Sequence, residues 1–216
     1  MKRVRLSCIL VGGILMGYLT IALVLPKEPR YQHRTLTQWL EPGTCAKPKN
    51  PFRNFSPPEP TSPVTQSAIK AIGTNAIPTL LKTTQAKDSS LRIRLNTLLD
   101  RQTLIAFRFR TACEQRAMGI QGFEVLGEDG KSAAPALALL IKDPDAGVRY
   151  AALESLRRVK PVREIIVPVL LKACSDPAPE IRFVAAVDLH FRCPQELERA
   201  GLTDPIIELH SPETAH

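Results

Sequence analysis

Apolar residues recur at a spacing of three and four over most of the chain, a pattern that predicts amphipathic helices. In the second half the pattern occurs twice with an offset of 33 residues. Residues 143–149, Asp-Pro-Asp-Ala-Gly-Val-Arg, return as residues 176–182, Asp-Pro-Ala-Pro-Glu-Ile-Arg, and Pro135 matches Pro168. A fixed period of about 20–50 residues is typical of stacked structural repeats. We therefore predict an all-α fold, a short α-solenoid of helical hairpins over residues 65–210.

Turn and cap residues indicate where these helices begin and end. Each copy consists of a first helix, an Asp-Pro turn and a second helix, with Asp143 or Asp145 as an N-cap. In front of the copies, one helix ends at Gly73, and Pro78 begins the next, which buries Leu80. The helices expected in the second half are 135–140, 148–159, 165–174 and 181–191, followed by an end cap over 197–209.

Residues 91–113 are expected to form one long helical region, and the pattern resumes through 117–127 despite Gly119 and Gly122. Its predicted buried stripe consists of Leu91, Leu95, Leu98, Ile105, Phe109 and Ala112.

Three arginines, Arg94, Arg101 and Arg108, are seven residues apart in this region and share a second helical face. They are the candidate partner-binding residues, for anionic lipid headgroups or an acidic protein. The alternative is a solvated flank, the commoner use of a charge run on a helix.

Leu6–Leu25 is a run of twenty residues without a charge, long enough to cross the hydrocarbon of a bilayer. We therefore expect residues 1–26 to form a transmembrane signal anchor. Basic residues in front of the run favour a cytoplasmic N-terminus and an extracytoplasmic body in the cell membrane; the alternative is cleavage and secretion. Gly13 and Gly17 would let two such helices approach closely, which would make a homodimer.

Three further segments surround the predicted array. Residues 27–41 are expected to form a short capping helix with Thr35 as its N-cap and Trp39 packed on the first hairpin. Residues 42–64 hold seven prolines and should be an extended linker. Residues 211–216 should be a disordered tail.

The charge of the chain is unevenly distributed. The net charge is +8 overall, but residues 27–116 hold 15 Lys or Arg against 6 Asp or Glu, whereas residues 117–216 hold 11 against 15. This asymmetry suggests an electrostatic partner for the front half. Aromatic residues make up only 5% of the chain, which suits thin helical layers filled by aliphatic side chains.

The sequence contains no recognisable catalytic, cofactor-binding or metal-binding motif. Cys45, Cys113, Cys174 and Cys193 are far apart, and the sequence leaves their pairing open, although buried thiols are favoured and a bond between Cys174 and Cys193 is not. An enzymatic site would have to use Cys113, Cys174, His190 or Cys193.

Residues 131–192 resemble the HEAT-like repeat family, in the pattern of its bacterial phycobilin-lyase-type members. The motif is Pro-x-Leu-x-x-Leu, then Asp-Pro, three residues, an aliphatic residue and Arg, then Ala-Ala and Leu, and it is partial in 67–82. The resemblance implies that the two copies' aspartates and arginines, Asp143, Arg149, Asp176 and Arg182, form a hydrogen-bonded ladder between repeats.

The resemblance also implies a function. Most such repeats are interaction scaffolds, so the leading hypothesis is a membrane-tethered scaffold that binds another protein and has no catalysis or cofactor of its own. One alternative is a bilin-lyase-like enzyme or chromophore handler. Another is nucleic-acid binding through the basic helical face, which the scarcity of stacking aromatics and an extracytoplasmic body disfavour.

Overall fold

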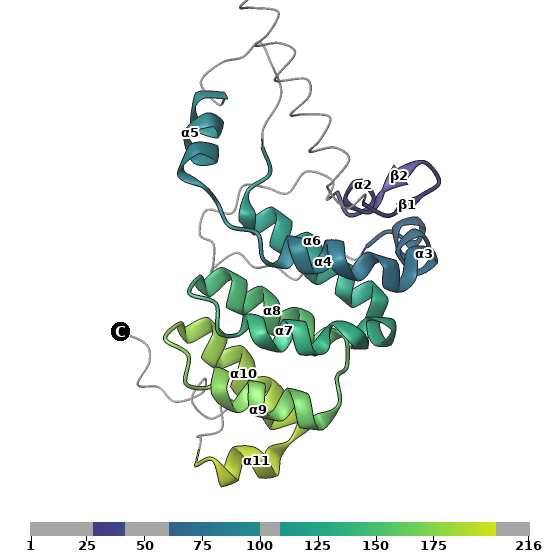
Figure 1. Ribbon diagram of the computed structural model, residues 1–216. Coiled ribbons are helices and arrows are strands. Elements are labelled where there is room, and N and C mark those ends of the chain that lie inside the picture. Colours follow the sequence, from purple (N-terminus) through teal and green to yellow (C-terminus); the bar gives the residue numbers. More distant parts are fainter. Residues whose placement is uncertain (1–27, 42–60, 100–108, 202–216) are drawn as a thin grey trace, which may run out of the picture.

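The computed structural model describes residues 28–41, 61–99 and 109–201, and these residues are mostly helical (Figure 1). The predicted anchor, the tail and Gly13, Gly17 and Cys45 lie outside them. Among the described residues, no helix is long and apolar enough to cross a membrane. The helices of the body are α3 (Pro63–Ile72), α4 (Ile77–Thr84), α6 (Ala112–Leu126), α7 (Ala134–Leu140), α8 (Ala146–Arg158), α9 (Arg163–Ala173), α10 (Pro179–Arg192) and α11 (Pro194–Arg199), with 3-10 turns at Gly73–Ala76 and Gly127–Ala133.

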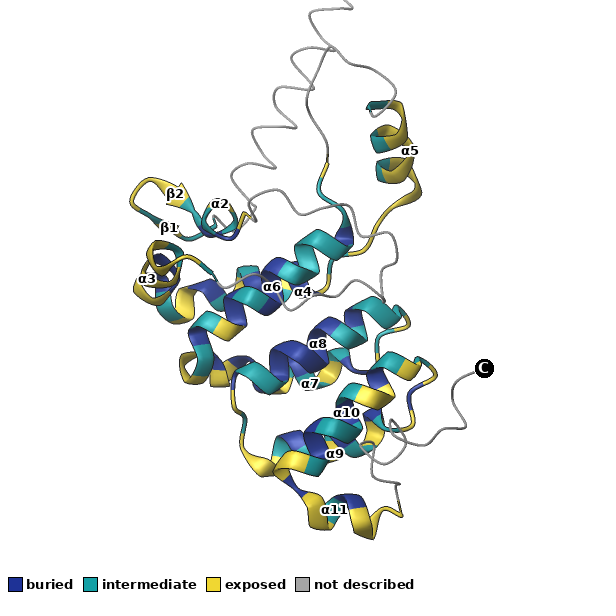
Figure 2. Ribbon diagram, turned by 180° about the vertical axis from the view of Figure 1, so that it is seen from behind, coloured by how far each residue is buried: buried dark blue, intermediate teal, exposed yellow. Residues whose placement is uncertain are grey.

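The body is a stack of layers, each made of two helices that pack on each other (Figure 1). Helix α4 packs on α6, α7 on α8, and α9 on α10, while α6, α8 and α10 pack in succession as the second helices of the layers. Buried residues occur on both helices of each layer and form one core cluster (Figure 2). Leu80, Leu137, Leu156 and Leu189, each 0% exposed, represent the aliphatic core that the composition predicts.

The Asp-Pro turns of the second and third layers are built in the same way. Asp143 accepts a hydrogen bond from the N–H of Asp145 at 2.8 Å, and Asp176 accepts one from the N–H of Ala178 at 2.9 Å. Asp145 also accepts from the N–H groups of Gly147 and Val148, which confirms it as the N-cap of α8.

An ion pair joins the second layer to the third. The Arg149 guanidinium donates two bonds of 2.8 Å to the Asp176 carboxylate, and its remaining nitrogen donates to the carbonyl oxygens of Asp143 and Pro144. Burial alone would raise the pKa of Asp176, but the bonds from Arg149 and Ala178 outweigh it and lower that pKa.

The expected ladder is only partly formed. Arg149 and Asp176 bridge two layers, but Arg182 donates to the carbonyl oxygens of Asp176 and Pro177, in the turn that precedes its own helix. The Asp143 carboxylate pairs with Lys87, in the segment that follows α4, at 2.8 Å and not with a member of the predicted set.

The two glycines of α6 explain how that helix packs. A Cβ at Gly119 would lie 2.6 Å from Oγ1 of Thr84, and a Cβ at Gly122 would lie 2.2 Å from Cδ2 of Leu80. The predicted helix is therefore present, and its glycines permit α4 to approach more closely than any side chain would allow.

The prediction of one helix over residues 91–113 is wrong. Helix α5 spans Ser90–Leu99, and residues 109–111 are not helical. Asn96 donates to the carbonyl oxygen of Phe109 and accepts from its N–H, both at 2.9 Å, whereas thirteen residues of continuous helix would separate the two by about 20 Å. Asn96 and Phe109 therefore do not lie on one continuous helix.

The predicted buried stripe of this region is also wrong at its described positions, except Ala112, which is 1% exposed. No residue of α5 is buried. The exposed fractions are 67% for Leu91, 36% for Leu95, 59% for Leu98 and 38% for Phe109.

The front of the chain contains a β-hairpin that the apolar pattern did not predict. Strands β1 (Arg30–Tyr31) and β2 (Arg34–Thr35) are antiparallel and lead into α2 (Leu36–Trp39). Gln32 and His33 occupy the turn with φ of 47° and 65°, the backbone of a tight two-residue hairpin. The sequence offers neither Asn nor Gly there, so the usual signal is missing.

Thr35 is the N-cap of α2, as predicted, and forms a capping box with Gln38. Leu36 and Leu40 are the residues of this unit that enter the core, not Trp39. The Trp39 indole instead braces the hairpin, donating to the carbonyl oxygen of Tyr31 at 3.1 Å and lying 5.1 Å from the Arg34 guanidinium.

The Pro-rich segment joins two elements that pack on each other, since α2 and β1 both contact α3. Helix α3 begins at Pro63, inside the predicted linker 42–64, with Ser62 as its N-cap. Residues 42–60 lie outside the described residues.

Gly122→Ala is expected to lower the free energy of unfolding by about 1–3 kcal/mol, because the new methyl group overlaps Leu80. In a Leu80→Ala background the same change should cost much less, because the obstructing methyl groups are gone. Urea unfolding measures both, with Gln121→Ala as the control on the same helix. An equal cost in the two backgrounds would contradict the packing described.

Candidate partner-binding groove

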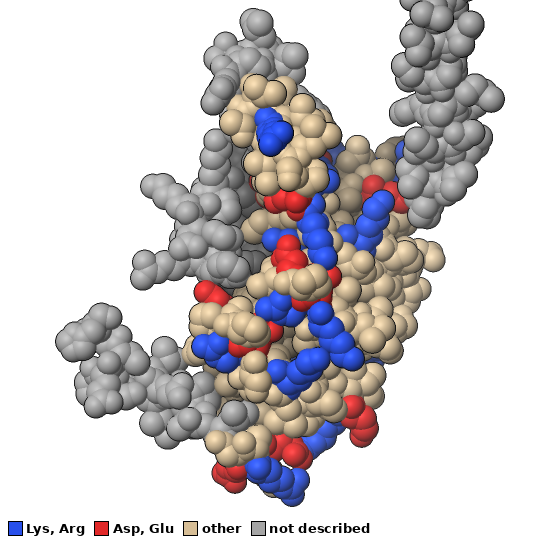
Figure 3. All heavy atoms as spheres, turned by 60° about the vertical axis from the view of Figure 1, so that its left-hand side comes forward, with Lys and Arg blue, Asp and Glu red and all other residues tan. Residues whose placement is uncertain are grey.

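The structure describes only one of the three predicted partner-binding arginines. Arg94 is exposed on α5, while Arg101 and Arg108 lie outside the described residues. Acidic and basic side chains interleave down the side of the molecule shown in Figure 3 and do not form a field of one sign there. Arg94 is therefore part of the α5 surface, and a shared arginine face stays a prediction.

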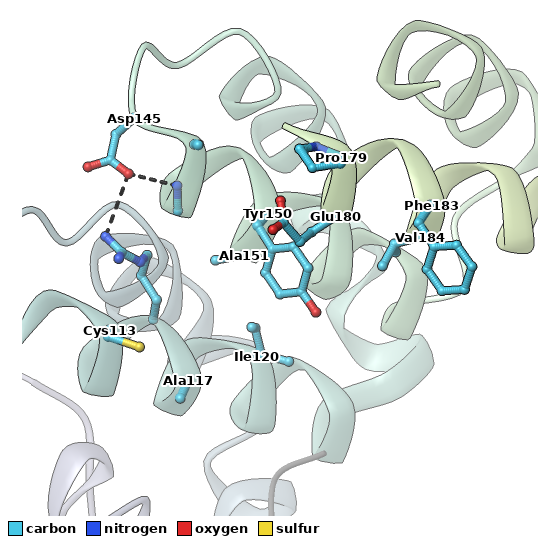
Figure 4. A pocket seen from close by; sticks show the side chains of 13 residues that line it. Cys113, Ala117, Ile120, Asp145, Tyr150, Ala151, Pro179, Glu180, Phe183 and Val184 are labelled. Atoms are coloured by element: carbon cyan, nitrogen blue, oxygen red, sulfur yellow. Dashed lines mark hydrogen bonds and ion pairs between the residues drawn. The ribbon is translucent and has the colours of Figure 1, made fainter. Parts of the chain in front are cut away.

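The second helices of the three layers, α6, α8 and α10, line a groove of about 680 Å³ (Figure 4). Its floor and walls are mainly apolar, with charged side chains at the edge. The lining residues are Cys113, Arg116, Ala117, Ile120, Asp145, Ala146, Gly147, Tyr150, Ala151, Pro179, Glu180, Phe183 and Val184.

Equivalent positions of the three helices build this groove. Ala117, Tyr150 and Phe183 are each 33 residues apart and all line it, and the same offset relates Cys113 to Ala146 and Pro179. The side chain at the first set is small on α6 and aromatic on α8 and α10. The 33-residue repeat could have identified these groove residues from the sequence. The charged residues that repeat at the Asp-Pro turns were more conspicuous and indicated the turns instead.

Tyr150 lies at the centre of the groove, between α6 and α10 (Figure 4). Burial, followed by the nearby Glu154 carboxylate, raises the pKa of its phenol to about 12. The hydroxyl is therefore neutral at physiological pH.

Arg116 lines the groove and precedes Arg149 by 33 residues. It donates to the carbonyl oxygen of Ala86 at 2.8 Å and lies 3.9 Å from Asp145. Its guanidinium packs over Gly147, where an added Cβ would lie 2.6 Å from Nη2. Arg116 in the first layer thus lines the groove and also contacts the second layer.

An ion network continues the surface of α8 and α10 beyond the groove. Arg157 pairs with Glu154 at 2.6 Å and with Asp188 at 3.1 Å, and Arg192 also pairs with Asp188. Glu154 and Asp188 are each only 5% exposed, so these paired charges help to hold the second and third layers in register.

The candidate enzymatic residues do not form one site in the described part of the chain. Cys113 lines the groove, Cys174 ends α9, and Cys193 is buried between α10 and α11. These three cysteines are not in disulfide bonds, and burial raises the pKa of the Cys174 thiol. The His190 ring contacts the Phe191 ring edge-on. Within the described residues, no group of His, Cys, Asp and Glu could hold a metal ion.

Comparisons of the chain with family models, curated proteins and solved structures find no match.

Tyr150→Phe is expected to change the alkaline limb of the pH–stability curve. A folded pKa of about 12, raised from 10.0, stabilises the fold below about pH 10, and this contribution disappears as pH rises through 12. The loss of stability between these values should be shallower in the variant. Absorbance titration of phenolate, as a difference between wild type and variant, locates the transition; one centred near pH 10 would contradict the burial of Tyr150.

Proposed function

We propose that this chain is a membrane-tethered scaffold of HEAT-like helical repeats that binds a segment of another protein in the groove on α6, α8 and α10. The observation that carries the proposal is the periodic lining of the groove. Because Ala117, Tyr150 and Phe183 occupy the same position in successive layers, the groove is a regular property of the stack. Stacked helical hairpins commonly use such extended faces for binding.

The equivalence of two layers supports the HEAT-like assignment. Arg149 donates to two carbonyl oxygens at 2.9 and 3.1 Å, and Arg182 donates to the two equivalent oxygens at 2.8 and 3.0 Å. Identical bonds at positions 33 apart are the expected result of one structural unit used repeatedly.

The chemistry of the groove suggests what the bound segment looks like. Tyr150, Phe183 and Val184 offer contact area to apolar side chains. At the rim, the two carboxylates of Asp145 and Glu180 outnumber the single guanidinium of Arg116, which already lies close to Asp145. The rim therefore carries a net negative charge. The favoured partner is a short apolar segment that carries a Lys or Arg.

The proposed tether is the uncharged run Leu6–Leu25, with the N-terminus in the cytoplasm and the body outside it. The support is the length of the run and the basic residues in front of it. This arrangement places the groove on the extracytoplasmic side, where the partner would be another membrane or extracytoplasmic protein.

A photo-crosslinking amino acid at position 183 of the full chain tests the groove in cells. Phe183 is 45% exposed in the groove, and Leu139 on α7 is 67% exposed and supplies the matched control position. We expect a discrete adduct with one protein from position 183 and not from position 139. Ala117→Arg, which fills the groove, should reduce that adduct, whereas Leu139→Arg should not.

With the partner in hand, Tyr150→Ala should weaken binding by roughly 10- to 30-fold, as for a central aromatic anchor. Affinity measured by isothermal calorimetry or fluorescence gives this value. The same adducts from positions 183 and 139, or a Tyr150→Ala variant of unchanged affinity, would rule out the groove as the binding site.

A further inference from the structure

Helix α5 carries an apolar face that lies open in the structure. None of its residues is buried, and Leu91, Leu95 and Leu98 are 67%, 36% and 59% exposed. These three residues follow the i, i+4, i+7 spacing that places side chains on one face of a helix. In Figures 1 and 2 the helix stands apart from the layers of the body.

A different side of α5 is tied to the body. Asn96 exchanges two hydrogen bonds of 2.9 Å with the backbone of Phe109, and Arg92 donates to the carbonyl oxygen of Arg110. Successive residues of a helix are about 100° apart, so Asn96 lies well round the helix from the leucine face. The bonds therefore fix which side of α5 faces outward.

The charge around the leucine face is positive. Arg94 is exposed and lies three residues after Leu91 and four before Leu98, at the border of the face. Residues 90–99 contain no Asp or Glu. Leucines bordered by a long cationic side chain suit the boundary between acyl chains and phosphates, because the guanidinium can reach the phosphates while the leucines leave water.

The position of α5 matches the position of the proposed tether. The uncharged run ends at Leu25, and Glu28 already belongs to the unit whose α2 and β1 pack on α3. Three residues span at most about 11 Å, so the tether holds the body against the bilayer surface. Figures 1 and 2 place α5 and the β1–β2 hairpin at the same end of the stack, opposite α11. The Arg110–Glu41 ion pair joins that unit to the segment before α6, whose Arg110 carbonyl oxygen also accepts from Arg92 of α5.

We propose that α5 docks on an anionic phospholipid surface, with the Leu91–Leu95–Leu98 face immersed at the acyl boundary and Arg94 at the lipid phosphates. This inference rests on the membrane tether of the proposed function and adds a second contact with the same bilayer. It gives the body a fixed orientation, with the groove held to the side of the stack and away from the lipid.

Depth-dependent quenching in reconstituted vesicles tests this docking. The full chain carries a fluorescent amino acid at position 98, or at the control position 139, in vesicles of brominated phosphatidylcholine with or without phosphatidylglycerol. We expect quenching at 98 but not at 139, strongest with phosphatidylglycerol and reduced by salt. Arg94→Glu should lower the docked fraction by about fivefold or more, as for the loss of a surface cation.

Leu91→Ser/Leu95→Ser should abolish the quenching at 98 and leave thermal unfolding unchanged, because α5 contributes no buried residue. Flotation of the vesicles separates the two proposals. A chain that floats but is not quenched at 98 keeps its tether and overturns the docking of α5, and a chain that does not float overturns both.

Two other outcomes also overturn the docking. If a second copy of the chain covers the leucine face, position 98 will be increasingly shielded from solvent and lipid as the ratio of protein to lipid rises. If the chain's own residues cover it, position 98 will be protected at every ratio and lipid composition. Equal quenching at position 98 with and without phosphatidylglycerol would show that Arg94 does not bind the lipid phosphates.

Discussion

The bidentate ion pair between Arg149 and Asp176 is the interaction on which the stack depends most. The two side chains are only 12% and 6% exposed, and each has a second task. Arg149 also binds the carbonyl oxygens of its own turn, and Asp176 also accepts the N–H of Ala178 in the next turn. One interaction thus shapes two turns and fixes the spacing of two layers. Such an arrangement is strong only when every partner is present, because a buried charge left alone is costly.

This constraint positions the second helices, and the position of the second helices creates the groove. The glycines of α6 bring the first layer close, Arg149 and Asp176 lock the second to the third, and the ion network around Arg157 repeats that link further along α8 and α10. Side chains at one register, Ala117, Tyr150 and Phe183, consequently face the same space. The same 33-residue period therefore sets both the contacts between layers and the residues of the proposed binding face.

The sequence predicted those elements whose signals are local. Asp145 as a cap, Gly73 as a stop and the Asp-Pro turns all follow from backbone hydrogen bonding within a few residues. Helix α5 shows why the prediction of a buried stripe was wrong: apolar spacing indicates a helical face but not what covers it, and Phe109 does not lie on the same helix as Asn96. The hairpin at Gln32 and His33 lacks the usual turn residues, so only the folded chain reveals its positive φ angles.

The groove required the stack itself, since its walls come from three helices distant in sequence. Cys113, Cys174, His190 and Cys193 were candidates by residue type alone, and the fold places only Cys113 in the groove. A thermodynamic cycle of Arg149→Ala and Asp176→Ala, measured by urea unfolding, tests most directly whether the layers are joined as described. A coupling free energy of about 1.5 kcal/mol or more is predicted, and a value within about 0.3 kcal/mol of zero would contradict the account.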